Sequence, residues 1–124
     1  MPETVFTEKA PRPVGPYSQA VKSAGLVFVA GQIPIDPETG RLVEGGIREQ
    51  TRRVIENIKA ILEAAGTGLD RVVYVTVYLA DLSLYPEFNE AYSEYMGDVR
   101  PARVTVQAAI PKGALLEMSV IAEA

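Results

Sequence analysis

The sequence of 124 residues contains neither cysteine nor histidine. Without cysteine the chain has no disulfide, no thiol nucleophile and no thiolate metal ligand, and without histidine it lacks the imidazole base and the commonest nitrogen ligand for metals. Most standard hydrolytic machinery is therefore excluded. Any chemistry must come from arginine, lysine, carboxylates, hydroxyls, backbone groups and bound water.

Long hydrophobic runs and an excess of positive charge are also absent. No apolar run approaches the roughly 20 residues that a membrane-spanning helix needs, and residues 1–10 have neither the basic start nor the apolar stretch of an export signal. The formal net charge of −4 gives no overall attraction to nucleic acid or anionic lipid. We therefore expect a cytoplasmic protein that binds neither nucleic acid nor a membrane.

The composition predicts a single domain that covers residues 1–124. Apolar residues make up 48% of the chain and charged residues 23%, a balance typical of globular proteins, and no stretch resembles a linker. A chain of this length can bury one core but is too short for two domains of ordinary size.

Two segments have the period of an amphipathic helix. Between Ile47 and Ala65 apolar residues recur every three or four positions, charged residues occupy the other side, and Gly66 follows as a terminator. A shorter pattern from Leu84 to Tyr95 predicts a second helix that ends near Gly97.

Short runs of β-favouring residues predict about six strands, at 4–7, 19–22, 26–30, 71–79, 103–110 and 115–123. Residues 31–46, rich in glycine and proline, predict a long ordered loop, and Pro111-Lys112-Gly113 predicts a hairpin turn between the last two strands. The fold class is therefore α+β, a mostly antiparallel sheet with both helices packed on one face.

The sheet face away from the helices is expected to be apolar as well. Strict alternation in residues 71–79 places Val73 and Val75 on one face and Val72 and Tyr78 on the other, and Ile121 of the last strand joins the uncovered face. Because an uncovered apolar face usually meets another subunit, the pattern predicts a homo-oligomer.

Alternation in the last two strands also predicts a shared position for a cation and a carboxylate. If Val104 and Leu116 both face the helices, Arg103 and Glu117 both lie on the opposite face. Such groups are candidates for binding or catalysis, although a structural ion pair explains the pattern equally well. The planar fork of Arg103 suits the carboxylate of a small organic acid, and Glu117 could orient or deprotonate a water molecule.

Four further residues are candidates that ordinary structural roles also explain. Tyr17 follows the rigid Gly-Pro turn and could be aimed into a cleft, or it could simply pack there. Gly31 opens the long loop, where a ligand could approach the backbone closely. Thr105 could add a hydroxyl or backbone donor, but threonine is common in strands. Asn89 lies on the polar side of the second helix and would otherwise pass as a solvated residue.

Several separated motifs resemble those of the Rid, or YjgF, family, in particular its RidA branch, across nearly the whole chain. They are Gly15-Pro16-Tyr17-Ser18-Gln19-Ala20, Gly31-Gln32-Ile33-Pro34, Phe88-Asn89-Glu90, Pro101-Ala102-Arg103, and Ile110-Pro111-Lys112-Gly113 followed by Glu117.

This resemblance implies a chorismate-mutase-like fold, assembled as a homotrimer with pockets between neighbouring subunits. It implies hydrolysis of 2-imino acids such as 2-iminobutanoate and 2-iminopropanoate to 2-keto acids and ammonia, with no cofactor and no metal. By the same resemblance Arg103 clamps the substrate carboxylate and Glu117 positions the attacking water. Tyr17, Gly31, Asn89 and Thr105 match pocket positions.

Some positions depart from the family pattern, and other functions stay open. Ala30 stands where a serine or threonine is common, and Val104-Thr105 stands where serine-cysteine is frequent, so the preferred imine is open. A non-catalytic regulatory trimer that binds small metabolites is the main alternative. A ribonuclease is disfavoured by the acidic balance and the missing histidine, and a chorismate mutase rests on fold analogy alone.

Overall fold

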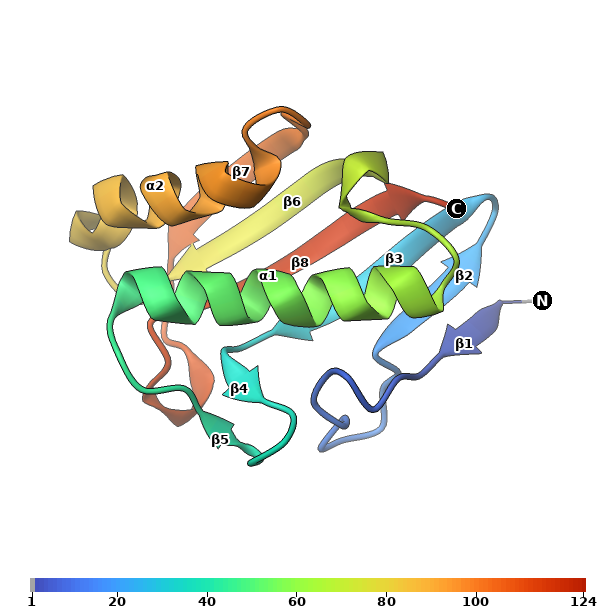
Figure 1. The fold of residues 1–124 in the computed structure, drawn as a ribbon, viewed down its shortest axis with the longest axis horizontal. Helices are drawn as coiled ribbons and strands as arrows, with labels where there is room; N and C mark the ends of the chain where they lie inside the picture. The colour runs from blue at the N-terminus through green and yellow to red at the C-terminus, as the bar shows by residue number, and fades with distance from the viewer. Residues whose placement is uncertain (1) are drawn as a thin grey trace.

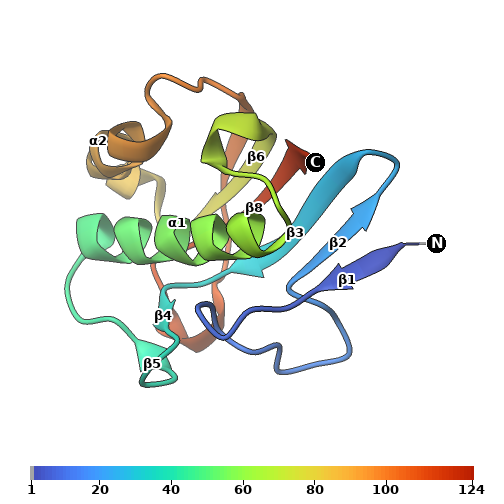
Figure 2. The same cartoon turned by 45° about the vertical axis from the view of Figure 1, so that its right-hand side comes forward.

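The computed structural model describes residues 2–124 and has a six-stranded sheet with both α-helices on one face (Figure 1; Figure 2). The strand order is β1-β2-β3-β8-β6-β7, and each neighbouring pair is antiparallel except β6 and β7. The strands are β1 (Glu3–Val5), β2 (Ala20–Ser23), β3 (Leu26–Gln32), β6 (Val72–Leu79), β7 (Ala102–Gln107) and β8 (Leu116–Glu123). The predicted α+β class is confirmed.

The first helix, α1 (Ile47–Ala64), buries the apolar stripe that its sequence predicts. The stripe residues are all buried: Ile47, Thr51, Val54, Ile55, Ile58, Ile61 and Leu62. At the start of the helix the Glu49 carboxylate accepts a hydrogen bond from the Gly46 backbone N–H, at 2.9 Å. The chain leaves the helix at Gly66, whose φ of +89° is a conformation that glycine adopts without strain. None of the helices in the described part of the chain is long and apolar enough to cross a membrane.

The second helix, α2 (Tyr85–Met96), packs beside α1 and buries Phe88, Ala91, Tyr92 and Met96. Pro86 stands in its first turn, where a missing N–H costs no hydrogen bond. The boundaries agree with the predicted helix, which begins and ends within one residue of α2.

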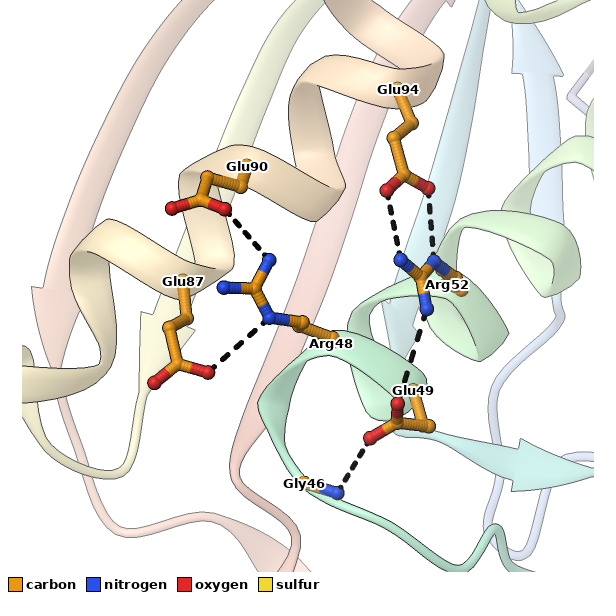
Figure 3. A network of polar contacts seen from close by, with 7 residues as sticks. All are labelled: Gly46, Arg48, Glu49, Arg52, Glu87, Glu90 and Glu94. Carbon is orange, nitrogen blue, oxygen red and sulfur yellow. Dashed lines mark hydrogen bonds and ion pairs between the residues drawn. The ribbon is translucent and has the colours of Figure 1, made fainter.

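Ion pairs join the exposed sides of the two helices (Figure 3). Arg52 of α1 donates two hydrogen bonds to the Glu94 carboxylate, at 2.9 and 2.8 Å. Arg48 contacts Glu90 at 2.8 Å and Glu87 at 3.4 Å. These side chains are solvent-accessible, so each pair contributes little alone, and the set acts as a surface network between the helices.

The predicted hairpin between the last two strands is wrong, because β6 lies between β7 and β8. β6, α2 and β7 form a crossover: the helix returns the chain to the end at which β6 starts, so β7 runs parallel to β6. β8 pairs with the other edge of β6 and with β3. The turn residues Pro111–Gly113 therefore lie in a connection that crosses the end of β6 instead of in a tight hairpin.

The predicted alternation of side chains fails at the start of β6, where the strand has a bulge. The pairing with β8 shifts between Val72 and Tyr74, so that Val72 is buried and Val73 is 42% exposed, the reverse of the predicted arrangement. From Val75 onward the alternation is as predicted, with Val75, Val77 and Leu79 buried under the helices.

A second bulge, in β3, shapes the region around the candidate site. Val29 pairs with Val120 and Gln32 with Met118, so Ala30 and Gly31 together oppose a single residue of β8. The following segment, predicted as a loop, contains the short antiparallel pair β4 (Ile35–Asp36) and β5 (Arg41–Leu42).

No helix of the described chain lies over the second face of the sheet, and this open face is largely apolar. Its apolar side chains include Phe28, Tyr74, Val104 and Val106, which are 38–41% exposed. Ile121 is half-buried between Phe28 and Tyr74. The predicted apolar open face is therefore present, although the sequence pattern places Val104 on the helix side.

Candidate active site

Arg103 lies on the edge strand β7, on the face that α2 covers. It pairs with Val75 of β6, whose side chain is buried under the helices, and paired residues of adjacent strands share a face. Its guanidinium carbon lies 5.6 Å from the ring centre of Tyr85, 5.4 Å from that of Phe88 and 4.7 Å from that of Tyr92. Three aromatic rings of α2 thus surround the cation, an arrangement that favours a positive charge.

The Arg103 guanidinium has no carboxylate partner among residues 2–124. Its Nη2 atom donates a hydrogen bond to the Tyr85 hydroxyl oxygen, at 2.8 Å. Arg48 and Arg52, by contrast, both pair with glutamates. Arg103 is half-buried and keeps donors available, so it can bind an anion that this chain does not itself supply.

Asn89 lies one helical turn after Tyr85 and is half-buried. Hydrogen bonding from the Asn89 side chain, together with the positive charge of Arg103, lowers the pKa of the Tyr85 hydroxyl. Burial instead raises the pKa of Tyr92. Thr105, two residues after Arg103, is half-buried on the same face of β7. The structure thus brings together Arg103, Asn89 and Thr105, which the sequence analysis selected separately, and adds Tyr85, which it missed.

Glu117 lies on β8 beside the bulge of β3, on the open face of the sheet. It pairs with Tyr78, and its flanking residues Leu116 and Met118 are buried on the helix side. A Cβ atom added at Gly31 would collide with the Glu117 carboxylate. The missing side chain at Gly31 is therefore what lets this carboxylate lie against the backbone of β3.

A cavity of about 390 Å³ opens beside this carboxylate. Its wall contains Glu117, Gly31, Tyr17, Gln19 and Lys112, together with Pro11, Arg12, Pro13, Val14, Ala30, Gln32, Ile33, Ile35 and Pro111. The Tyr17 side chain is 51% exposed, and its hydroxyl accepts a weak bond of 3.4 Å from the Val14 backbone N–H. Tyr17, Gly31 and Glu117, predicted from three distant segments, therefore line one cavity.

Arg103 and Glu117 do not share a face, and that prediction is wrong within one chain. Arg103 faces α2, whereas Glu117 lies on the open side, and β6 separates their strands. Strands twice removed are about 10 Å apart, so the two charged groups form separate sites in the monomer. The error follows from the predicted hairpin. β7 pairs with β6 and not with β8, so the face on which each β7 side chain lies is set by its partner in β6.

Three buried side-chain amides hold the walls of the cavity. Gln19, which is 1% exposed, donates to the carbonyls of Thr7 and Pro11 at 3.0 and 2.9 Å and accepts from the Thr7 N–H at 2.7 Å. Gln50 of α1 accepts from the Leu115 N–H at 2.8 Å, just before β8 begins.

Asn57, two helical turns after Gln50 and fully buried, donates to the Ile35 carbonyl at 3.0 Å. Arg53 donates to the Asn57 Oδ1 atom at 3.1 Å, which directs the Asn57 NH₂ group toward the loop. Because Gln50 and Asn57 lie on the same side of α1, this helix fixes both the loop that follows β3 and the loop that precedes β8.

Lys112 is a cavity residue that the sequence analysis did not select. Its φ of +62° is uncommon for a residue other than glycine, and such strain collects at functional sites. The Pro111-Lys112-Gly113 motif could have signalled it. Within residues 2–124 no group of three or more acidic side chains is placed to hold a metal ion.

Comparison with known proteins identifies relatives over nearly the whole chain. The family model described as Endoribonuclease L-PSP matches residues 7–124. A RutC family protein of Pyrococcus abyssi is 63% identical over 121 residues, which is 97% of this chain and 95% of that protein. The chloroplastic Reactive Intermediate Deaminase A of Arabidopsis thaliana is 45% identical over 97% of this chain and 65% of its own length. The crystal structure of E. coli TdcF with bound serine superposes with a TM-score of 0.93 at 36% identity, covering 98% of both chains.

Proposed function

Because the chain belongs to the Endoribonuclease L-PSP family, also called the YjgF or Rid family, we propose that it hydrolyses reactive 2-imino acids to 2-keto acids and ammonia. The substrates we propose are small imines such as 2-iminobutanoate and 2-iminopropanoate. The observation that carries the proposal is the half-buried Arg103 guanidinium, which lies within three aromatic rings and has no carboxylate partner in the described chain.

A 2-imino acid carries a carboxylate, which is the partner that the Arg103 guanidinium lacks in the described chain. Its carboxylate can accept two parallel N–H bonds from the guanidinium, which fixes the adjacent C=N carbon in position. Two relatives support this class of ligand: one is named a reactive intermediate deaminase, and the TdcF structure holds serine, a small amino acid with the same carboxylate.

Glu117 supplies the second part of the chemistry in this proposal. A protonated imine is already electrophilic, so the reaction needs a positioned water more than a strong nucleophile. The Glu117 carboxylate accepts a proton from a water molecule while the water oxygen bonds to the imine carbon, which gives a neutral carbinolamine. Glu117 then returns this proton to the nitrogen, and the C–N bond breaks as the C=O bond forms. The ammonia that leaves takes the hydroxyl proton, so iminium plus water gives keto acid plus ammonium. Tyr17 and Gly31 line the same cavity, and Asn89 and Thr105 lie beside Arg103.

The proposal includes a homotrimer with the site between subunits. Arg103 lies at the outer edge of the sheet, whereas Glu117 lies on the open apolar face, and one chain does not bring them together. If the β7 edge of one subunit meets the open face of the next, the two halves form one pocket. The exposed apolar residues of that face would then be buried between subunits.

The test couples an amino acid oxidase or a threonine dehydratase to the purified protein and follows imine decay. We expect the wild type to accelerate decay above the spontaneous rate, and the Arg103→Ala and Glu117→Ala variants to lose this acceleration. Arg71→Ala is a matched control, because Arg71 pairs loosely with Glu123 away from both half-sites. A wild-type protein that adds nothing to spontaneous hydrolysis would refute the deaminase, even if it binds 2-keto acids as a regulator.

The family's description also names ribonuclease activity, and the same preparations test it. The chain has no histidine and a net charge of −4, neither of which favours RNA cleavage. We expect no cleavage of a single-stranded RNA by the purified protein. Cleavage by the wild type that disappears in Arg103→Ala would instead favour the ribonuclease.

A further inference from the structure

Tyr85, the first residue of α2, is hydrogen-bonded to Arg103 and has no role in the proposal so far. Its hydroxyl oxygen accepts the 2.8 Å bond from Arg103 Nη2. A guanidinium only donates hydrogen bonds, so the phenolic hydrogen of Tyr85 cannot point at Arg103 and is available to another acceptor.

Tyr85 is the most exposed of the aromatic side chains around Arg103. Of the three rings around Arg103, Phe88 is fully buried and Tyr92 is 7% exposed, but Tyr85 is 38% exposed. Among these rings, Tyr85 is the one that solvent reaches, so an anion bound at Arg103 can also contact the Tyr85 hydroxyl. The hydrogen bond from the Asn89 side chain and the charge of Arg103, which lower the pKa of Tyr85, also make its O–H a stronger donor.

We propose that the Tyr85 hydroxyl binds the substrate carboxylate directly, as a second donor beside Arg103. This inference rests on the proposed function for the identity of the ligand. The guanidinium keeps its two parallel N–H bonds to the carboxylate, and the phenol donates to the remaining lone pair of one carboxylate oxygen. Both donors come from the same subunit. Tyr85 acts on binding and takes no part in the proton transfers at the imine.

The experiment compares Tyr85→Phe with the wild type. The variant keeps the aromatic ring that stacks on Arg103 and removes only the hydroxyl. We expect KM for the imine, and Kd for the product 2-ketobutanoate, to rise about tenfold, since a hydrogen bond to a charged group contributes roughly that factor to binding. We expect kcat to change by less than about threefold, because an interaction present in both ground and transition states affects binding alone.

Tyr95→Phe is the control, since Tyr95 lies on the same helix and loses a hydroxyl bond of 2.9 Å to Glu56, away from Arg103. It should leave KM and Kd unchanged. The Arg103→Lys background separates direct contact from an effect through the arginine. If Tyr85 contacts the ligand, Tyr85→Phe still weakens 2-ketobutanoate binding there.

Three results would overturn the inference. They are an unchanged KM and Kd in Tyr85→Phe, a loss confined to kcat, or an effect that vanishes in the Arg103→Lys background, which would make Tyr85 only a positioning residue. The inference and the proposed function fail separately. A wild type without imine hydrolysis whose binding of 2-ketobutanoate depends on Tyr85 refutes the deaminase and supports the Tyr85 contact. An active enzyme whose KM and Kd are unchanged in Tyr85→Phe supports the deaminase and refutes the Tyr85 contact.

Discussion

Gly31 and the Glu117 carboxylate lie so close together that no side chain fits between them. A Cβ atom at position 31 would lie 2.9 Å from the Glu117 carboxyl carbon and nearer still to one of its oxygens. The contact joins the bulge of β3 to the second residue of β8, so the absence of an atom in one strand sets the position of a charged group in the next.

We expect Gly31→Ala to displace the carboxylate without unfolding the protein. Gly31 does not have a positive φ, and the atom that must move is the flexible end of a side chain. The free energy of unfolding should fall by less than about 1 kcal/mol, whereas kcat for imine hydrolysis should fall at least about tenfold. In the Glu117→Ala background, where the colliding carboxylate is absent, the same substitution should not lower the free energy of unfolding. An additive loss would show that Gly31 acts independently of Glu117.

Asn57 and Thr51 provide a contrast within one helix. Both are fully buried in α1, but Asn57 bonds to the loop after β3, whereas the Thr51 hydroxyl has no hydrogen-bond partner in the described structure. Asn57→Leu removes the donor to the partly buried Ile35 carbonyl and should lower the free energy of unfolding by about 1–2 kcal/mol. Thr51→Val should be neutral or stabilising. Urea unfolding measures both, and equal losses would contradict the anchoring role of Asn57.

The Glu94–Arg52 ion pair between the helices and the Glu49 contact at the start of α1 predict a fall in stability at acid pH. Hydrogen bonds from Arg52 lower the pKa of Glu94, and the Gly46 N–H lowers the pKa of Glu49. Groups with a lowered folded-state pKa contribute stability above their unfolded value, near 4.5, and lose it as the pH falls through the folded value. Tm should therefore decline below about pH 5. Glu94→Gln should show a smaller decline than the wild type, and an identical Tm profile would exclude this pair as a cause.

The open face predicts how assembly and activity are linked. Val104 is 39% exposed in the single chain, so Val104→Lys should leave the fold intact. In a trimer that buries this face, the buried lysine charge should dissociate the subunits. Light scattering should then report monomers, circular dichroism should be unchanged, and imine hydrolysis should be lost because the half-sites are separated. Active monomers would contradict a site shared between subunits.

The helices and the inner faces of β6 and β8 follow from the sequence because local periodicity determines them. The apolar residues from Ile47 to Leu62 fit the period of a helix with one buried side. In β8, Leu116 and Met118 alternate with more exposed residues without interruption. The facing of β7 could not be obtained in this way. It depends on which strand β7 joins, a long-range choice that the turn-like Pro111–Gly113 segment obscured. The bulge at Val73 likewise adds one residue that strict alternation does not anticipate.

In the candidate site too, local patterns identified some residues, whereas a residue that depends on a long-range contact was missed. Tyr17, Gly31 and Glu117 could be selected individually, and the structure places them around one cavity. Tyr85 was missed because its significance comes from Arg103, which is 18 residues away in the chain and reaches it across the β6–β7 crossover. Its position four residues before Asn89, on the same side of one helix, was the available signal.

β8 lies at the centre of the sheet although it follows every other strand in the chain. Until Leu116–Glu123 have left the ribosome, β3 and β6 have no shared partner and both expose unpaired edges. The sheet can therefore assemble only after β8 has been synthesised, through contacts between distant segments, which is a slow route. Nascent chains that stall before β8 should be open to aggregation and to chaperone binding, whereas chains that have emerged beyond it should not.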